Sequence, residues 1–141
     1  MVGIDSKCVQ RTNVSNIKFE ENHKKIIFSN VERKYCYKIQ VDGCVITQGK
    51  RCDNLLKVGE IIDVGKEYYV ELKGTDVPHA VEQIESTIDL LHNDNSPIEC
   101  FIIFSNMSPK FTSKIQLAKV KFERKYKAKL LFFEREHQVK I

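Results

Sequence analysis

Residues 51–73 read RCDNLLKVGEIIDVGKEYYVELK, and this stretch decides the fold. Its two ends, residues 52–58 and 67–73, have the apolar, β-branched and aromatic content of β-strands. Gly59 and Gly65 bound the segment between them, as glycines do where a chain reverses direction. The stretch therefore predicts two neighbouring strands joined as a hairpin.

Side chains alternate along the second of these strands. Its two faces carry Tyr68, Val70 and Leu72 on one side, and Tyr69, Glu71 and Lys73 on the other. We expect the first set to face the core, because successive side chains of a strand point to opposite faces. Glu71 and Lys73 then point the same way, roughly 7 Å apart along the strand.

The hairpin is symmetric about residue 62. Gly59 and Gly65 are equidistant from this position, and so are Asp53 and Glu71. If the strands pair antiparallel in that register, Asp53 lies across from Glu71, with Cα atoms roughly 4.5–5.5 Å apart. Two like charges placed opposite each other destabilise a sheet, so the pair predicts a cation between the two carboxylates.

A strand, a helix and a second strand are expected downstream. Asp76 suits the N-cap and Pro78 the first turn of a helix that runs to about Leu91 with a 3.6-residue apolar period. Residues 98–104, IECFIIF, form a near-continuous apolar run that is typical of a strand buried on both faces. This order predicts a crossover connection and some parallel pairing.

The remaining elements complete an α/β domain. Residues 35–41 and 44–47 are expected to be strands, residues 111–126 a basic helix and residues 129–133 a last strand, whereas residues 15–30 fit a short helix followed by a strand. The expected fold is a mixed central sheet, an antiparallel meander and then a helix-crossover strand, flanked by helices.

Length and charge indicate one domain over residues 1–141, with its core motif region at about 41–104. Residues 110–141 hold ten Lys or Arg against three Glu, a local charge of +7 in a chain of net charge +4. Such a basic region is the electrostatic footprint of a surface that meets phosphate backbones, although a solvated lysine-rich helix face has the same composition.

Cysteine usage and hydropathy indicate a cytoplasmic protein. The five cysteines are scattered, form no CxxC or Cys/His cluster and are expected to be free, mostly buried thiols rather than zinc ligands. No apolar run resembles a signal peptide or approaches the roughly 20 residues that span a bilayer. We therefore expect no membrane association.

The two acids and the lysine suit phosphodiester hydrolysis. Mg²⁺, or Mn²⁺ in its place, prefers oxygen ligands, which the carboxylates of Asp53 and Glu71 and the backbone carbonyl of Leu72 would supply. A bound cation acidifies its water and neutralises the charge that grows on a phosphoryl group. Lys73 would hold the attacking water and stabilise the transition state. Taken singly, each residue is also explained as ordinary surface charge.

Asp53 followed by Glu71-Leu72-Lys73 resembles the signature of the PD-(D/E)XK nuclease superfamily, which includes restriction endonucleases and Holliday-junction resolvases. The likeness extends from about Val41 to Leu91 and implies a restriction-endonuclease-like fold. It also implies a Mg²⁺-dependent endonuclease acting on DNA, in which Asp53 and Glu71 bind the metal and Lys73 assists the attacking water. Cys52 stands where the family name has proline.

The resemblance implies further residues and partners. Gln83 matches a glutamine that many RecB-like members carry on the next helix, although Thr87 replaces the tyrosine that often follows it. Many members also use an acid from an N-terminal helix, for which Glu20, Glu21 and Glu32 are the candidates. Members often form a homodimer or join a larger defence or repair complex.

Two other functions fit the same residues. One is a catalytically inactive nuclease-fold module that binds nucleic acid or a protein partner. The other is an interaction protein whose acids are surface charge only. Binding of Mg²⁺ or Mn²⁺ distinguishes the nuclease from both.

Overall fold

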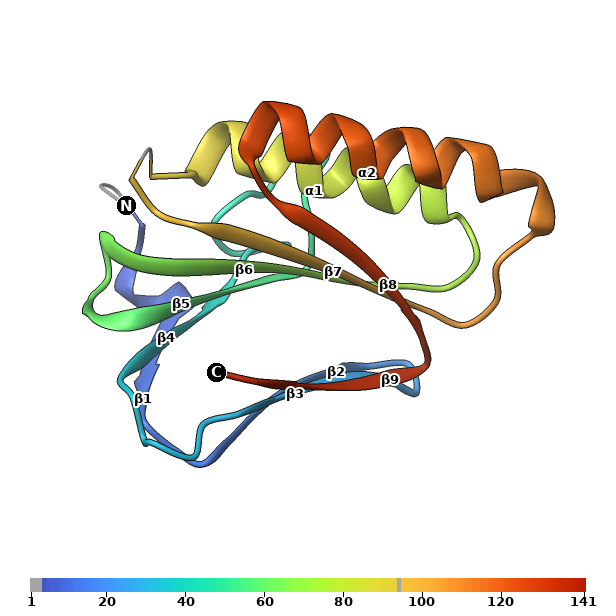
Figure 1. Cartoon of the computed structure of the whole chain (residues 1–141). Helices are drawn as coiled ribbons and strands as arrows, with labels where there is room; N and C mark the ends of the chain where they lie inside the picture. The colour runs from blue at the N-terminus through green and yellow to red at the C-terminus, as the bar shows by residue number, and fades with distance from the viewer. Residues whose placement is uncertain (1–3, 94) are drawn as a thin grey trace.

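The computed structural model describes residues 4–93 and 95–141. A six-stranded mixed sheet forms its centre, in the order β1-β4-β5-β6-β7-β8 (Figure 1). Its strands are β1 (Val9–Thr12), β4 (Cys36–Gln40), β5 (Asn54–Ile61), β6 (Val64–Lys73), β7 (Ile98–Phe104) and β8 (Lys129–Glu134). The pairs from β1 to β6 are antiparallel, and β6, β7 and β8 run parallel to one another. The expected meander and the parallel crossover are both confirmed.

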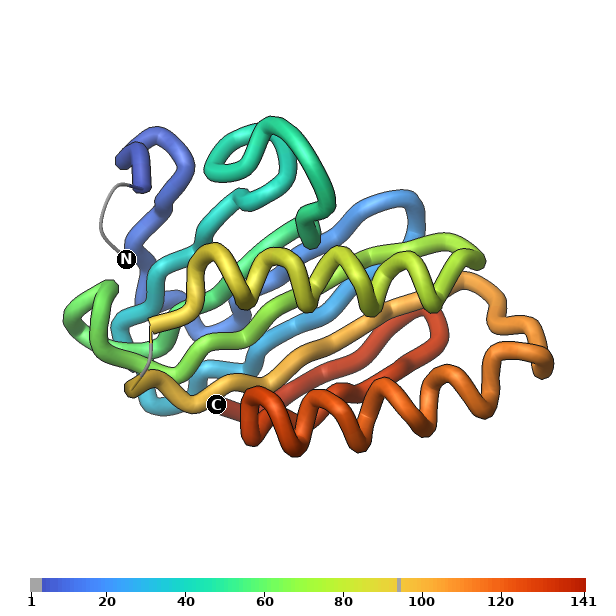
Figure 2. The backbone as a smooth tube through the Cα atoms, turned by 90° about the horizontal axis from the view of Figure 1, so that it is seen from above, coloured from blue at the N-terminus to red at the C-terminus, as the bar shows by residue number. Residues whose placement is uncertain are grey.

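Two helices cover one face of this sheet. They are α1 (Val77–Leu91) and α2 (Thr112–Tyr126), and Figure 2 shows them lying side by side above the strands. The carboxylate of Asp76 accepts a hydrogen bond from the backbone of His79 at 3.2 Å, so it caps α1 as expected. Each helix connects two neighbouring parallel strands: α1 connects β6 to β7, and α2 connects β7 to β8.

The opposite face is covered by a second sheet, which was not expected. Its strands are β2 (Asn16–Glu21), β3 (Lys24–Ser29) and β9 (Glu136–Lys140), in the order β2-β3-β9 (Figure 1). Residues 15–30, expected to hold a short helix, form the β2–β3 hairpin instead. Apolar side chains at alternate positions bury this hairpin on the central sheet.

The central sheet is therefore buried on both faces. One cluster of core residues lies under the helices and includes Leu55, Tyr69 and Ile84. The other lies between the two sheets and includes Phe28, Val70 and Phe101. The face of β6 that carries Glu71 is thus covered by α1 rather than open to solvent.

The register of the central hairpin is the one expected from its symmetry. Asn54 pairs with Val70 and Leu55 with Tyr69, which centres the two strands on residue 62. A Cβ atom added to Gly59 would lie 2.5 Å from the carbonyl oxygen of Val64, and one added to Gly65 would collide with the carbonyl of Val58. The two glycines therefore allow the strands to approach at the irregular end of the hairpin.

Two other expectations are wrong. Residues 44–47 are not a strand but part of a turn, which an isolated bridge between Asp42 and Ile46 closes. Cys8 and Cys44 are not free thiols but form a disulfide, because the loop after β4 folds back beside the N-terminal segment (Figure 2). The expectation of free buried thiols is confirmed for Cys36, Cys52 and Cys100.

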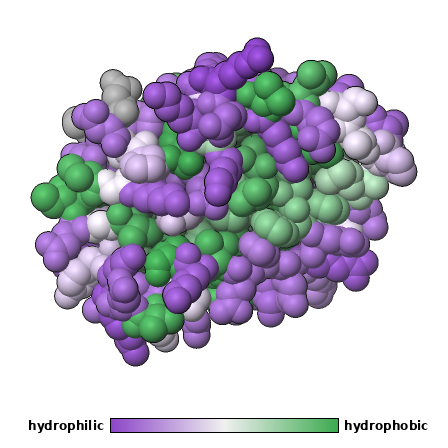
Figure 3. All heavy atoms as spheres, in the orientation of Figure 1, coloured by the Kyte–Doolittle hydropathy of each residue, from purple (hydrophilic) through white to green (hydrophobic). Residues whose placement is uncertain are grey.

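The surface is mostly polar. Figure 3 shows hydrophilic side chains over most of the face seen in Figure 1, with hydrophobic ones gathered between the helices and the smaller sheet, where β8 is the edge strand. In the described part of the chain, no helix has the length and apolar content that crossing a bilayer would require.

Candidate metal and active site

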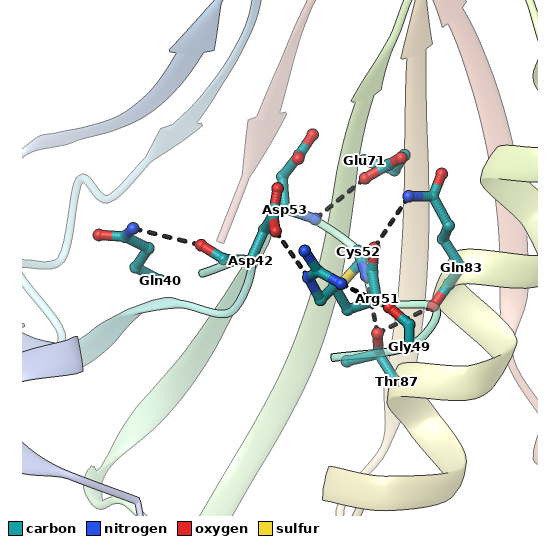
Figure 4. Close-up of polar contacts among 9 residues, drawn as sticks. All are labelled: Gln40, Asp42, Gly49, Arg51, Cys52, Asp53, Glu71, Gln83 and Thr87. Carbon is teal, nitrogen blue, oxygen red and sulfur yellow. Dashed lines mark hydrogen bonds and ion pairs between the residues drawn. The ribbon is translucent and has the colours of Figure 1, made fainter. Parts of the chain in front are cut away.

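Asp53 and Glu71 meet where β5 begins. The backbone N–H of Asp53 donates to Oε1 of Glu71 at 2.9 Å, and the backbone N–H of Leu72 donates to Oδ2 of Asp53 at 2.8 Å. Each acid thus accepts a backbone hydrogen bond, Glu71 from Asp53 (Figure 4) and Asp53 from the residue that follows Glu71. The opposition of the two residues that was expected from the hairpin is present.

The backbone of Leu72 contacts Asp53. In a strand, the N–H and C=O of one residue point to the same edge, and the N–H of Leu72 points at Asp53. The N–H of Cys52, which a continued ladder would bring to the carbonyl of Leu72, donates instead to Thr87 Oγ1 at 2.8 Å. The carbonyl of Leu72 thus lies on the same edge of β6 as the N–H that contacts Asp53, without a hydrogen bond from Cys52.

The two carboxyl groups oppose each other's ionisation. Glu71 is 1% exposed, and burial, followed by the charge of Asp53 and a hydrogen bond to it, raises the pKa of Glu71 to about 9. Burial also raises the pKa of Asp53, although hydrogen bonds from Leu72 and Glu71 counteract this. The pair therefore resists carrying two negative charges at neutral pH.

Lys73 and Glu21 lie close enough to this pair to act on it electrostatically. The charge of Lys73 lowers the pKa of Asp53, of Glu71 and of Glu21. The pKa of Glu21 is raised, first by burial and then by the charges of Asp53 and Asp42. Of the three N-terminal acids considered, Glu21 is thus the one beside the site, and it comes from the end of β2 rather than from a helix.

The other two N-terminal acids are occupied elsewhere. Glu20 forms an ion pair with Lys18 at 3.5 Å, and Glu32 forms one with Lys34 at 3.5 Å. The Glu32 side chain is 73% exposed, which places it on the protein surface rather than in a site.

Helix α1 holds the chain segment that leads into Asp53. Gln83 Nε2 donates to the carbonyl of Arg51 at 3.0 Å, and Thr87 Oγ1 accepts from Cys52 while donating to the carbonyl of Gln83 at 2.8 Å (Figure 4). Among the described residues, the Oε1 atom of Gln83 is buried without a hydrogen-bond partner. Gln83 thus contacts the backbone two residues before Asp53.

The role of Thr87 was missed from the sequence. Its spacing of four residues from Gln83 places both on one helix face and was the available signal. The Thr87 hydroxyl accepts the hydrogen bond that the N–H of Cys52 would otherwise donate to the neighbouring strand β6. The pairing of β5 with β6 therefore ends at this point.

The loop between β4 and β5 holds Asp53 from the other side. The carbonyl oxygen of Asp53 accepts from the backbone N–H groups of Val41 at 3.0 Å and Asp42 at 3.2 Å. The carboxylate of Asp42 is itself held by Arg51 Nε at 2.7 Å. Hydrogen bonds thus hold the N–H and the carbonyl group of Asp53, and its carboxyl group accepts a further one from Leu72.

The donor set suits a small hard cation that keeps most of its water. Within residues 4–93 and 95–141, no group of three or more His, Cys, Asp or Glu side chains could hold a metal ion. Mg²⁺ is commonly held by one or two carboxylates together with waters and substrate phosphate oxygens. Asp53 and Glu71 supply two such carboxyl groups, and a bound cation would favour their ionised forms.

The basic helix is less basic on its surface than its sequence indicates. Lys121 lies 2.9 Å from Glu85, and Lys125 lies 3.4 Å from Glu85 and 3.6 Å from Asp89, both on α1. Neighbouring acids thus partly neutralise the positive charge of α2.

No protein-family model, curated protein or solved structure matches the chain.

Proposed function

We propose that this protein is a metal-dependent phosphodiester hydrolase of the PD-(D/E)XK type, an endonuclease acting on DNA with Mg²⁺ or Mn²⁺. The observation that carries the proposal is the buried Asp53–Glu71 pair, in which the backbone N–H of Asp53 donates to Glu71 at 2.9 Å and both carboxyl groups have raised pKa values. A buried pair of this kind is costly in a structural protein, because burial and mutual repulsion both oppose its ionisation.

The surrounding elements support the same reading. The restriction-endonuclease-like fold places the first acid at the start of one hairpin strand and the second acid and the lysine on its partner, followed by a helix and a parallel strand. Here β5, β6, α1 and β7 follow that order, with β6 and β7 parallel. Lys73 lies two residues beyond Glu71, on the same side of β6.

Each residue has one task in the proposed reaction. Asp53, Glu71 and the carbonyl of Leu72 hold the cation, which acidifies a bound water and screens the negative charge of the phosphodiester. Lys73 orients the attacking water and stabilises the charge that develops on the phosphoryl oxygens. Gln83 keeps the Arg51–Cys52 backbone in place and so positions Asp53.

The test is cleavage of labelled plasmid DNA, single-stranded DNA and RNA by the purified protein in Mg²⁺ or Mn²⁺. We expect DNA cleavage by the wild type, none by Asp53→Asn or Glu71→Gln, and full activity in Asp89→Asn, an exposed acid on α1. Wild-type protein that cleaves none of these substrates in either metal contradicts the proposal.

A second candidate is the inactive nuclease-fold module that binds nucleic acid or a protein partner. The reciprocal hydrogen bonds favour it, since each acid has a structural task in ending the β5–β6 ladder. Calorimetry separates the two candidates: the nuclease binds Mn²⁺ with release of a proton from Glu71, whose pKa is raised to about 9, whereas the inactive module shows no heat of metal binding.

A further inference from the structure

A cavity of about 390 Å³ lies between β2, the edge strand of the smaller sheet, and strands β1 and β4 of the central sheet. Its polar lining consists of three lysines, three amides and one acid: Lys7, Lys18, Lys38, Gln10, Gln40, Asn54 and Glu20. Amines and amide N–H groups are the donors that proteins use for phosphate oxygens, and the lining is positive overall.

Lys38 contributes one of the three amines that line this cavity. Its Nζ lies 4.9 Å from the centre of the Phe19 ring, which also lines the cavity. Burial, and then the charge of Lys18, lowers the pKa of Lys38. A bound anion would reverse both effects, because it would replace lost water and offset the neighbouring positive charge.

The cavity adjoins the candidate active site through two elements. Asn54 lines the cavity and directly follows Asp53, with its side chain on the opposite face of β5. Strand β2 contributes Lys18 and Glu20 to the cavity and ends at Glu21, whose pKa responds to Asp53 and Lys73. From Lys18 to Glu21 is roughly 10 Å along β2.

We propose that this cavity binds a backbone phosphate of the polynucleotide substrate, beside the bond that is cut. The inference rests on the proposed function for the identity of its ligand. It places the principal nucleic-acid contact on β1, β2 and β4 rather than on α2. Lysines on both surfaces form ion pairs, Lys18 with Glu20 at 3.5 Å as well as Lys121 with Glu85 at 2.9 Å, but the structure gives no ion pair for Lys38 in the described part of the chain.

The test measures binding without cleavage. A fluorescent 20-nucleotide DNA, single-stranded or duplex, is titrated in EDTA by fluorescence anisotropy at several salt concentrations. Lys38→Gln and the more exposed Lys18→Gln should each weaken binding about 3- to 10-fold, and each should reduce the slope of log K against log salt by about 0.7–0.9. Thermal unfolding of each variant checks that it is folded.

Lys119→Gln is the matched control, because Lys119 also lies over an aromatic ring, 5.6 Å from Phe132, but on α2. It should bind DNA as the wild type does. Equal losses in Lys119→Gln and Lys38→Gln, or no loss in Lys18→Gln and Lys38→Gln, overturn the inference.

Two competitors test the class of ligand. Pyrophosphate that displaces DNA at or below the Kd of the oligonucleotide would assign the cavity to a small phosphate compound, and tighter binding of polyglutamate than of DNA would assign it to an acidic protein. Either result overturns the assignment of a polynucleotide as the ligand of the cavity. A folded Lys38→Gln variant that binds normally while wild type cleaves DNA refutes only this inference. DNA binding through Lys38 with no cleavage refutes only the proposed function.

Discussion

Glu71 and Asp53 act on each other through a hydrogen bond and through charge. The Oε1 atom of Glu71 accepts the Asp53 N–H at 2.9 Å, and the charge of Asp53 helps to raise the pKa of Glu71 to about 9. Glu71 thus helps to position the backbone of Asp53, while Asp53 opposes the ionisation of Glu71.

Removing the amine of Lys73 should impair catalysis more than metal binding. Because Lys73 is proposed to stabilise charge that develops only in the transition state, Lys73→Ala should lower kcat by about 10²- to 10³-fold. Cleavage is measured at saturating Mn²⁺, with metal affinity taken from calorimetry. Lys50→Ala, an exposed lysine paired with Glu82, is the control. A Lys73→Ala variant with wild-type kcat would exclude the proposed role.

The free energy of unfolding of the metal-free protein should fall as pH rises from about 4.5 to about 9. Folding raises the pKa of Glu71 from its usual 4.5 to about 9, so in this window the folded chain keeps a proton that the unfolded chain has released. The contribution is complete below the lower value and declines by at most about 1.4 kcal/mol per pH unit. Urea unfolding at several pH values measures it.

The same titration has a metal-dependent counterpart. Mn²⁺ favours the ionised pair, so its stabilisation of the fold should grow with pH over that window. Glu71→Gln should remove this metal effect and flatten the decline with pH. A decline of unchanged steepness in Glu71→Gln would assign the pH dependence to another group.

Replacing the hydroxyl of Thr87 should destabilise the fold and displace Asp53. In Thr87→Val the buried N–H of Cys52 loses its acceptor, which costs about 1–3 kcal/mol of unfolding free energy. DNA cleavage should fall as well, because Asp53 directly follows Cys52. Thr87→Ser keeps the hydroxyl and should behave nearly as the wild type in chemical unfolding and in cleavage.

Reduction of the Cys8–Cys44 disulfide should lower the free energy of unfolding by roughly 3–4 kcal/mol. The bond closes a loop of sequence separation 36, and it restricts the unfolded chain accordingly. Guanidinium unfolding with and without dithiothreitol measures the change. The Cys8→Ser/Cys44→Ser double variant should match the reduced wild type and show no response to dithiothreitol. A wild type equally stable in both states would contradict this prediction.

The central hairpin could be predicted because its signals are local. Two glycines, alternating side chains and a symmetric pair of acids fix the register between Asn54 and Val70. The second sheet could not be predicted in the same way. Its β2–β3 turn places Asn22 and His23 at positive φ, of 47° and 63°, without the glycine that marks most such turns.

Burial of the site was underestimated for a related reason. Tyr69 was expected on the face of β6 opposite to the core, yet it is fully buried and donates to Glu67 at 2.9 Å. Which elements cover a strand depends on contacts between segments distant in the sequence, and alternation within the strand does not contain that information. The hydrogen bond between Thr87 and Cys52 joins residues 35 positions apart, so it could not be predicted from the local sequence either.

The register of the central hairpin also limits how this protein can evolve. Because Asp53 and Glu71 are equidistant from residue 62, gaining or losing one residue near the β5–β6 turn would bring a neighbour of Asp53 opposite Glu71, with its side chain on the other face. Measured along the strand, that turn lies roughly 26 Å from the acids. We therefore expect homologues to conserve the length of this distant turn as strictly as the acids themselves, even where its residues differ.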